Sequence, residues 1–179
     1  MKKEEGKCYH IYNRGNNKEN IFYEEGNYFF FLDKLKSYLI PHVDVFAYCL
    51  MPNHFHLFIR VNDLHNFEKG IKNFFISYAK AINQKYFRVG SLFQGRYKIS
   101  EIDSDAYFTR IVTYIHQNPA TSKLVNKIGD YKFSSYNSYL SSEKGSLLKR
   151  TEVLSWFGGI ENFIEYHKVN ETYEVFKTS

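Results

Sequence analysis

Cysteine is scarce in this chain, and its scarcity excludes two kinds of scaffold. The 179 residues include only two cysteines, Cys8 and Cys49, which lie far apart and form no C-x-x-C pair. The sequence therefore offers neither a zinc knuckle nor a framework of disulfides. This cysteine usage is typical of a reducing compartment, and we expect a cytoplasmic protein, associated with the nucleoid if nucleic acid is its partner.

Long apolar runs are also missing. The opening MKKEEGKCYH has no apolar stretch of the kind that a secretory signal needs, and the most aromatic segment, NYFFFLDKLKSYLI, is interrupted by charges well before membrane-spanning length. Internal repeats and low-complexity runs are absent as well. We therefore expect a soluble protein with no membrane partner, and 179 residues suffice for one domain with an extension.

Basic and aromatic residues are what the chain has in excess. Lys and Arg number 24 against 19 Asp and Glu, which gives a formal charge of +5, and aromatic residues make up 19% of the chain. A basic protein favours an acidic partner such as nucleic acid, and surplus aromatic rings can stack on unpaired bases. An AT-rich coding bias enriches Phe, Tyr, Lys and Asn equally well, so both explanations stay open.

Apolar periodicity predicts a ferredoxin-like α+β fold. The expected elements, in order, are a strand at 8–14, a helix at 24–39, a hairpin turning at Pro52 and Asn53, a helix at 66–86 and a strand at 91–102. The order βαββαβ is that of an antiparallel sheet whose two helices cover one face. The other face would then be open, with polar side chains on it.

The rest of the chain is expected to be mainly helical. One helix begins near Ser104, a residue type that caps helix N-termini well, and is expected to end at Pro119. The segment SSYNSYLSSEKGS is predicted to be a flexible connection. From Lys144 onward we expect two short helices, broken at Gly158 and Gly159.

Two histidines in the hairpin are the most informative feature of the sequence. In MPNHFHLFIR, His54 and His56 are separated by one apolar residue, so both imidazoles point to one face of the expected strand. Histidine is a common metal ligand, and this spacing presents two nitrogen ligands side by side. A pair of surface histidines at the start of a strand explains the spacing alone equally well.

A tyrosine and an asparagine lie four residues apart near the end of the helix that begins at Ser104. Tyr114 and Asn118 therefore project from one side of that helix. Taken alone, the pair is best explained by packing, with Tyr114 at the rim of the core and Asn118 as a helix-end cap. Tyr107 lies on the same side one heptad earlier and weakens the pattern further.

Five segments, taken in order, resemble one family of proteins. They are YHIYNRGNN, YCLMPNHFHLFIR, LFQGRYK, YIHQNPATSKLV and DYKFSSYNSYL. The chain resembles the REP-associated tyrosine transposases, which belong to the single-tyrosine HUH transposases (His, hydrophobic residue, His) and are similar to transposases of the insertion sequence two-hundred type. The resemblance covers roughly residues 8 to 140 and is far more specific than a lone H-x-H. We accordingly place an HUH transposase catalytic domain at 1–125 and a helical extension packed on it at 126–179.

The resemblance implies a role for each member of the two polar pairs. His54 and His56 become metal ligands, Tyr114 the nucleophile, and Asn118 a third ligand or a polar partner of the metal. The implied cofactor is Mg²⁺ or Mn²⁺, because a phosphodiester is a hard oxygen ligand, although two imidazoles are more typical of zinc or manganese than of magnesium. Attack by Tyr114 would give a 5′-phosphotyrosyl enzyme and a free 3′-hydroxyl. His116 faces away from Tyr114 on the helix and is a poor candidate for the general base.

The implied substrate is single-stranded DNA that carries small hairpins. Candidate contacts to it are Asn13, Arg14, Gly15 and Asn16, which follow the first strand, and Arg96 and Lys98, which are expected to share one face of the fourth. A solvated loop and an ordinary charged strand end are the plainer interpretation. A homodimer also has to be considered, because related transposases include dimers that place the tyrosine helix of one subunit against the histidines of the other.

Two other classes of function fit the same residues. In a ferredoxin-like nucleic-acid-binding protein without catalytic activity, aromatic residues would stack on bases and the histidines would only hydrogen-bond phosphate. In a metal-dependent hydrolytic nuclease, the histidines would hold an ion, activated water would attack, and Tyr114 would be structural. Metal affinity separates the first class from a transposase, and a covalent DNA adduct excludes the second.

Overall fold

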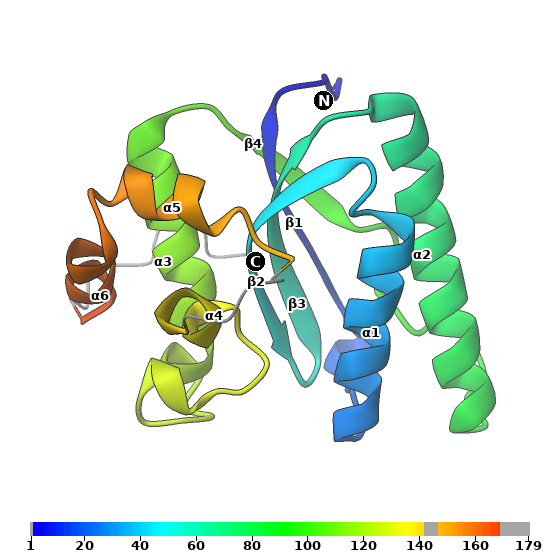
Figure 1. Cartoon of the computed structure of the whole chain (residues 1–179). Helices are drawn as coiled ribbons and strands as arrows, with labels where there is room; N and C mark the ends of the chain where they lie inside the picture. Colours follow the sequence, from blue (N-terminus) through cyan, green and yellow to red (C-terminus); the bar gives the residue numbers. More distant parts are fainter. Residues whose placement is uncertain (1, 142–146, 169–179) are drawn as a thin grey trace.

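A four-stranded antiparallel sheet forms the centre of the molecule (Figure 1). The computed structural model describes residues 2–141 and 147–168. The strands are β1 (Cys8–Arg14), β2 (Val43–Met51), β3 (His54–Val61) and β4 (Lys98–Ile102), in the spatial order β2-β3-β1-β4. Helices α1 (Glu25–Tyr38) and α2 (Leu64–Lys85) complete the βαββαβ order. The predicted ferredoxin-like fold is confirmed.

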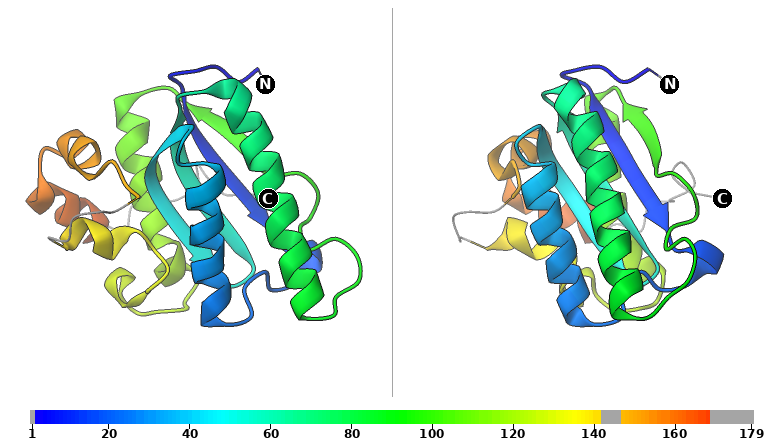
Figure 2. Two further views of the ribbon diagram at one scale, coloured as in Figure 1. Left: turned by 45° about the vertical axis from the view of Figure 1, so that its right-hand side comes forward. Right: turned by 90° about the vertical axis from the view of Figure 1, so that its right-hand side faces the viewer.

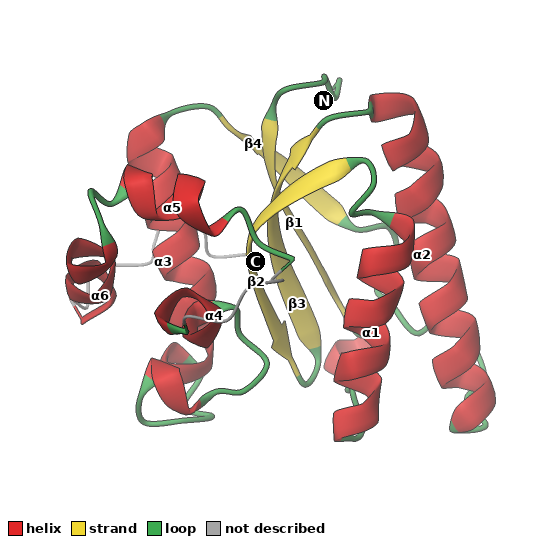
Figure 3. Cartoon of the chain, in the orientation of Figure 1, coloured by secondary structure: helices red, strands yellow, loops and turns green. Residues whose placement is uncertain are grey.

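Helices cover both faces of this sheet, so the molecule has three layers (Figures 2 and 3). α1 and α2 lie on one face. The helices on the other side are α3 (Asp105–Thr121), α4 (Tyr136–Leu140), α5 (Arg150–Trp156) and α6 (Ile160–Lys168), and short 3-10 turns are η1 (Asn16–Lys18) and η2 (Ile128–Asp130). The face that we expected to be open is therefore covered by α3 and the elements after it. None of the helices in the described ranges is both long and apolar enough to cross a membrane.

Local sequence explains why α1 and α2 begin where they do. The side chains of Glu24 and Asn27 form a capping box at the N-terminus of α1. At the start of α2 the Asp63 carboxylate accepts a 3.0 Å hydrogen bond from the backbone N–H of Asn66, so the helix begins two residues earlier than predicted. The buried stripe of α2 consists of Phe67, Gly70, Ile71, Phe74, Tyr78 and Ile82.

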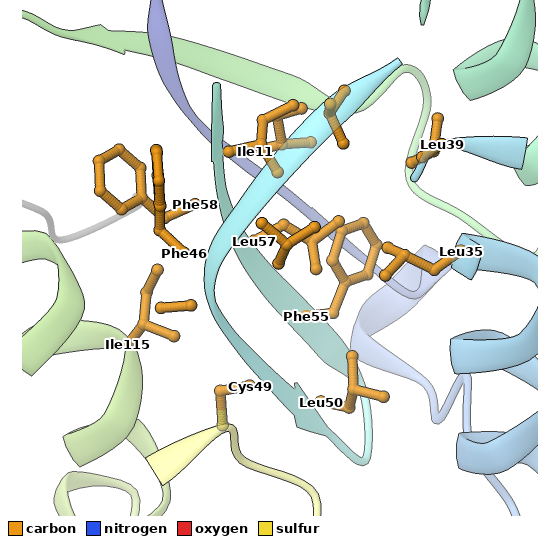
Figure 4. Packing of buried hydrophobic residues seen from close by; sticks show 14 of the residues in the cluster. Ile11, Leu35, Leu39, Phe46, Cys49, Leu50, Phe55, Leu57, Phe58 and Ile115 are labelled. Atoms are coloured by element: carbon orange, nitrogen blue, oxygen red, sulfur yellow. The ribbon is translucent and has the colours of Figure 1, made fainter. Parts of the chain in front are cut away.

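The side chains of β3 alternate between two apolar layers, one on the side of α1 and one on the side of α3 (Figure 4). Figure 4 shows Phe55 and Leu57 on the side of Leu35 in α1, and Phe58 with Phe46 on the side of α3. Phe58 packs there against Phe108 of α3, with ring centroids 5.6 Å apart. The predicted alternation of β3 is thus confirmed, and its histidine-bearing face looks toward α3.

The fourth strand is shorter than predicted. Residues 91–97 form a loop, in which Gly95 has φ +74° and the Ser91 hydroxyl donates a 2.6 Å hydrogen bond to the carbonyl of Phe93. A left-handed glycine interrupts a strand, and the buried Phe93 gave the segment its strand-like pattern. Consequently Arg96 precedes β4 and does not share a strand face with Lys98, which corrects that expectation.

Helix α3 begins after Ser104, as predicted, but it continues through Pro119 to Thr121. A proline in a helix removes the N–H that would bond the carbonyl four residues earlier. In the last turn this costs a single hydrogen bond, so the helix persists to its end at Thr121. Asn118 therefore lies inside the helix and not at its final residue.

The chain after α3 packs on the sheet more closely than expected. Tyr136–Leu140 form α4 where we expected a flexible connection, because Tyr139 is fully buried and its hydroxyl donates to the carbonyl of Phe46 in β2. The rest of that expected connection, residues 142–146, lies outside the described residues. α5 and α6 are separated at Gly158 and Gly159 as predicted, with φ of +75° and +119° that favour glycine.

Candidate active site

The two histidines of β3 lie side by side beneath α3. The ring centroids of His54 and His56 are 5.2 Å apart, with ring planes at 87° to each other. His54 is half-buried and His56 is only 2% exposed. A pair of surface histidines, the alternative interpretation of their spacing, does not describe His56.

Asn53 fixes the tautomer of His54. The Oδ1 of Asn53 lies 2.7 Å from Nδ1 of His54, and because a carbonyl oxygen only accepts, Nδ1 must carry the proton. Burial lowers the pKa of His54 below its ordinary value, although the Asn118 oxygen, to which only the protonated ring could donate, opposes the shift. The ring is therefore neutral at pH 7, and its lone pair lies on Nε2.

Asn118 brings α3 into the site. Its Oδ1 faces Nε2 of His54 at 3.5 Å. Both atoms present a lone pair, so neither can donate a proton to the other. An imidazole nitrogen and an amide oxygen that converge in this way form a donor set that fits a divalent cation. The direction of the Asn118 side chain argues against the helix-end cap.

Tyr114 lies one turn before Asn118 on the same side of α3. Its ring meets that of His56 edge-on, with centroids 5.4 Å apart and planes at 81°. Burial raises the pKa of Tyr114, and a hydrogen bond with the Asn118 side chain partly offsets the rise. One strand and one helix of the same chain thus bring together a phenolic hydroxyl, an amide and two imidazoles.

Histidine, cysteine and carboxylate side chains alone do not form a candidate cation site in the described part of the chain. Within residues 2–141 and 147–168, no three histidine, cysteine, aspartate or glutamate side chains gather closely enough to hold a metal ion. If His54 and His56 bound an ion, the amide oxygen of Asn118, 3.5 Å from Nε2 of His54, would be the candidate third protein ligand. Such a set leaves coordination positions for oxygens of a substrate.

A cleft of about 520 Å³ opens beside the two histidines. Its lining comes from the end of β1, η1, the β2–β3 turn, the start of β3 with both histidines, the loop before β4, β4 itself and the segment after α3, whereas Tyr114 and Asn118 are not among the described lining residues. Arg14, Lys18 and Lys98 contribute three positive charges, whereas no carboxylate is found among the described lining residues. An electropositive cleft next to a candidate cation site suits the phosphates of a nucleic-acid strand.

Three of the six predicted DNA-contacting residues line the cleft, and the other three do not. Asn13, Arg14 and Lys98 line the cleft. Gly15 and Asn16 shape the loop beside it: a Cβ on Gly15 would overlap the carbonyl of Glu19, and the backbone N–H of Asn16 donates to the carbonyl of Leu92. Arg96 is exposed in the loop before β4. A role in DNA binding stays a prediction for all six.

His116 belongs to a buried chain of hydrogen bonds that leads away from Tyr114. Ser135 accepts from the backbone N–H of Tyr48 at 2.9 Å and lies 2.7 Å from Nε2 of His116. Nδ1 of His116 lies 2.9 Å from Nε2 of His167, whose Nδ1 donates to the carbonyl of Phe163. This chain links β2 through α3 to α6, and it agrees with the expectation that His116 is not the general base.

His10 and Tyr12 were missed by the sequence reasoning. Tyr12 pairs with His56 across β1 and β3, so it shares the histidine face, and His10 lies two residues earlier on that face. The ring centroids of His10 and Tyr114 are 6.1 Å apart. Alternation along YHIYNR places His10, Tyr12 and Arg14 on one face, but only the register with β3 shows that this face is the one with the histidines.

Comparisons with known proteins agree with this architecture. Residues 5–118 match the family model described as "Transposase IS200 like". A solved structure of a REP-associated tyrosine transposase bound to a REP hairpin has a TM-score of 0.63 at 15% identity, over 82% of this chain and 87% of that one. A putative transposase from Deinococcus radiodurans has a TM-score of 0.43 at 18% identity, over 64% of this chain and 95% of that one. No curated protein matches the chain.

The family match covers well over half of the sequence and includes the strand with both histidines and the helix as far as Asn118. The REP-associated transposase shares the fold over most of both chains. The motifs that suggested a transposase are therefore supported by an independent match. The chain belongs to the IS200-like transposase family.

Proposed function

We propose that this transposase cleaves and rejoins hairpin-bearing single-stranded DNA through a 5′-phosphotyrosine at Tyr114, with a divalent ion, Mg²⁺ or Mn²⁺, at His54, His56 and Asn118. The observation that carries the proposal is the double contact of Asn118. Its side chain hydrogen-bonds Tyr114 and also faces Nε2 of His54 at 3.5 Å. Asn118 therefore lies next to both the candidate nucleophile and a candidate metal ligand.

In the proposed reaction the hydroxyl oxygen of Tyr114 attacks the phosphorus of a phosphodiester. The bond from phosphorus to the 3′-oxygen breaks, the hydroxyl proton is lost, and the departing oxygen becomes a 3′-hydroxyl by taking up a proton. The phosphotyrosine conserves the bond energy, so the 3′-hydroxyl of another strand can reverse the step without water or ATP. The bound ion would supply positive charge to the non-bridging phosphate oxygens.

The protein's own residues prepare Tyr114 for this step. The contact with His56 and the hydrogen bond with Asn118 hold the ring in one orientation, which favours in-line attack. Its half-buried position limits the access of water, and this favours strand transfer over hydrolysis. The hydrogen bond with Asn118, which offsets part of the rise in the pKa of Tyr114 caused by burial, would also stabilise the phenolate that forms as the proton leaves.

The DNA partner is inferred from the cleft and from the similar structure. That structure is bound to a REP hairpin. In this chain Arg14, Lys18 and Lys98 would contact phosphates of a strand in the cleft that His54 and His56 also line. We keep 1–125 as the catalytic unit and 126–179 as an extension that supports α3. All four site residues come together within one chain, which supports catalysis within one subunit, and a homodimer stays a prediction.

A denaturing gel with end-labelled hairpin DNA tests the proposal. Wild type, Tyr114→Phe and the control Tyr107→Phe are compared with Mn²⁺, with Mg²⁺ and with EDTA. A slow-migrating protein–DNA band is expected with metal in wild type and Tyr107→Phe only. Cleavage without this band would identify a hydrolytic nuclease. DNA binding without cleavage, repeated on a second hairpin, would identify a non-catalytic binding protein.

A further inference from the structure

A histidine that the proposed reaction does not use is hydrogen-bonded to one of the proposed metal ligands. Nε2 of His10 in β1 lies 2.9 Å from Nδ1 of His56 in β3. The two rings are nearly parallel, with planes 17° apart and centroids separated by 5.1 Å. Both residues are 2% exposed. At this distance one ring nitrogen points at the other and one proton lies between them.

The position of that proton decides whether Nε2 of His56 keeps a lone pair that could bind an ion. If Nε2 of His10 donated it, neutral His56 would carry its own proton on Nε2, and that nitrogen would have no lone pair for an ion. If Nδ1 of His56 donates it, Nε2 of His56 keeps its lone pair. A neutral imidazole has one nitrogen that can accept, so Nε2 of His10, buried 2.9 Å from Nδ1 of His56, can take this proton when the proton of His10 lies on Nδ1.

We propose that His10 is a positioning residue that accepts the Nδ1 proton of His56 and thereby keeps Nε2 of His56 available as the metal-binding nitrogen. This inference rests on the proposed function, in which His56 is a ligand. Hydrogen bonds to the second ring nitrogen of a metal-binding histidine orient the ring and raise its basicity. His10 would act on His56 only, without touching substrate.

The other ligand supports the proposal because it is held in the same way. Asn53 Oδ1 lies 2.7 Å from Nδ1 of His54 and selects the tautomer with a lone pair on Nε2. In the proposed arrangement each ligand has its own acceptor, His10 on β1 for His56 and Asn53 in the β2–β3 turn for His54. Each acceptor leaves the lone pair on Nε2 of its histidine.

Two tyrosines shield the His10–His56 hydrogen bond. The ring of Tyr12 lies 5.0 Å from that of His10 and 5.9 Å from that of His56. Tyr114 meets both histidine rings edge-on, at centroid distances of 6.1 Å and 5.4 Å. A hydrogen bond that is protected from water in this way keeps its direction, which a positioning role requires.

A tautomer measurement tests the proposal without metal or DNA. Long-range ¹H–¹⁵N correlation spectra of the full chain at pH 7 distinguish protonated from unprotonated ring nitrogens, and His56→Gln identifies the His56 signals by their loss. We expect a protonated Nδ1 and an unprotonated Nε2 on His56. A proton on Nε2 of His56 would overturn the proposal, whether or not the protein proves to be a metal-dependent transposase.

Metal affinity gives the second readout. Titration of the full chain with Mn²⁺ is expected to show binding that is about 10 to 100 times weaker for His10→Phe, which fills the space but cannot accept. His10→Gln offers an amide oxygen and should recover most of the affinity, and thermal unfolding controls for folding in both variants. Wild-type affinity in His10→Phe, or no recovery in His10→Gln, would contradict the acceptor role. Absence of Mn²⁺ binding in wild type would reject the proposed cofactor, while the tautomer result would stand by itself.

Discussion

Nε2 of His54 and Oδ1 of Asn118 face each other across 3.5 Å, although the two residues are 64 positions apart in the sequence. β3 provides the nitrogen and α3 the oxygen, and neither atom can give the other a proton. The strand motif and the helix motif therefore belong to one site. The register of the sheet and the packing of α3 create it, and the following predictions test its parts.

Asn118→Ala should reduce metal-dependent cleavage much more than it reduces stability. The amide oxygen is the proposed third ligand, whereas loss of a helix-end cap would cost only about 1 kcal/mol. Cleavage rate at saturating Mn²⁺ and the melting temperature are measured on the same preparation. Asn118→Asp keeps an oxygen at the position and should retain activity with metal. A fall in melting temperature of about 2 to 4 °C together with normal turnover would instead favour the cap.

His54→Ala should abolish cleavage and leave DNA binding largely intact. Charge and stacking supply most of the affinity for a nucleic acid, whereas the imidazole is a proposed metal ligand. Fluorescence anisotropy with labelled hairpin DNA, in EDTA and in Mn²⁺, measures binding separately from cleavage. If binding in EDTA falls as much as cleavage does, the histidine is a DNA contact and not a metal ligand.

Lys98→Ala should weaken DNA binding more than Arg96→Ala does. Lys98 lines the cleft, while Arg96 is exposed in the loop before β4, so the two form a matched pair only two residues apart. Loss of one phosphate contact with single-stranded DNA should reduce the slope of log K against log salt by about 0.7. Dissociation constants at several salt concentrations give this slope. Equal slopes for the two variants would mean that the cleft is not the phosphate path.

Acid should loosen the attachment of α6 to α3 through His167. Burial lowers the pKa of His167 to about 4, below the value of about 6.5 for an unfolded histidine. Because the pKa of His167 is lower in the folded state, the unfolded state takes up the proton first as the pH falls. The free energy of unfolding is therefore undiminished above about pH 6.5 and falls toward pH 4, by up to about 1.4 kcal/mol per pH unit.

The fluorescence of Trp156, the single tryptophan, follows this transition from α5. Urea unfolding of wild type and His167→Leu is compared between pH 7.5 and pH 4.5. The variant should be less sensitive to pH across the window from about 6.5 to 4. Identical pH dependence in the two proteins would show that His167 does not contribute.

Elements whose signals are local could be predicted from the sequence. Strand alternation in HFHLFIRV separates the two faces of β3, and the glycine pair at 158–159 marks the break between α5 and α6. Helix spacing likewise places Tyr114 and Asn118 on one side of α3. These patterns depend on neighbouring residues alone, so no tertiary information is needed to interpret them.

The features that were missed depend on contacts between distant residues. α4 forms because Tyr139 is buried against the carbonyl of Phe46, 93 positions away. The hydrogen bond of His10 exists only in the observed register of β1 and β3, 46 positions apart in the sequence. β4 was predicted too long because the buried Leu92 and Phe93 imitate strand residues although they pack from a loop. These features therefore depend on tertiary packing, which the periodicity of the sequence does not reveal.

Peptide mapping of the covalent product tests the central claim most directly. Trypsin releases residues 111–123, in which Tyr114 is the only tyrosine, separately from residues 99–110, which contain Tyr107. After reaction with hairpin DNA and Mn²⁺, followed by nuclease digestion, we expect a 5′-phosphonucleotide on Tyr114 in the first peptide. The same mass on Tyr107 or on another residue, or cleaved DNA with unmodified 111–123 under conditions that trap the intermediate, would contradict Tyr114 as the nucleophile.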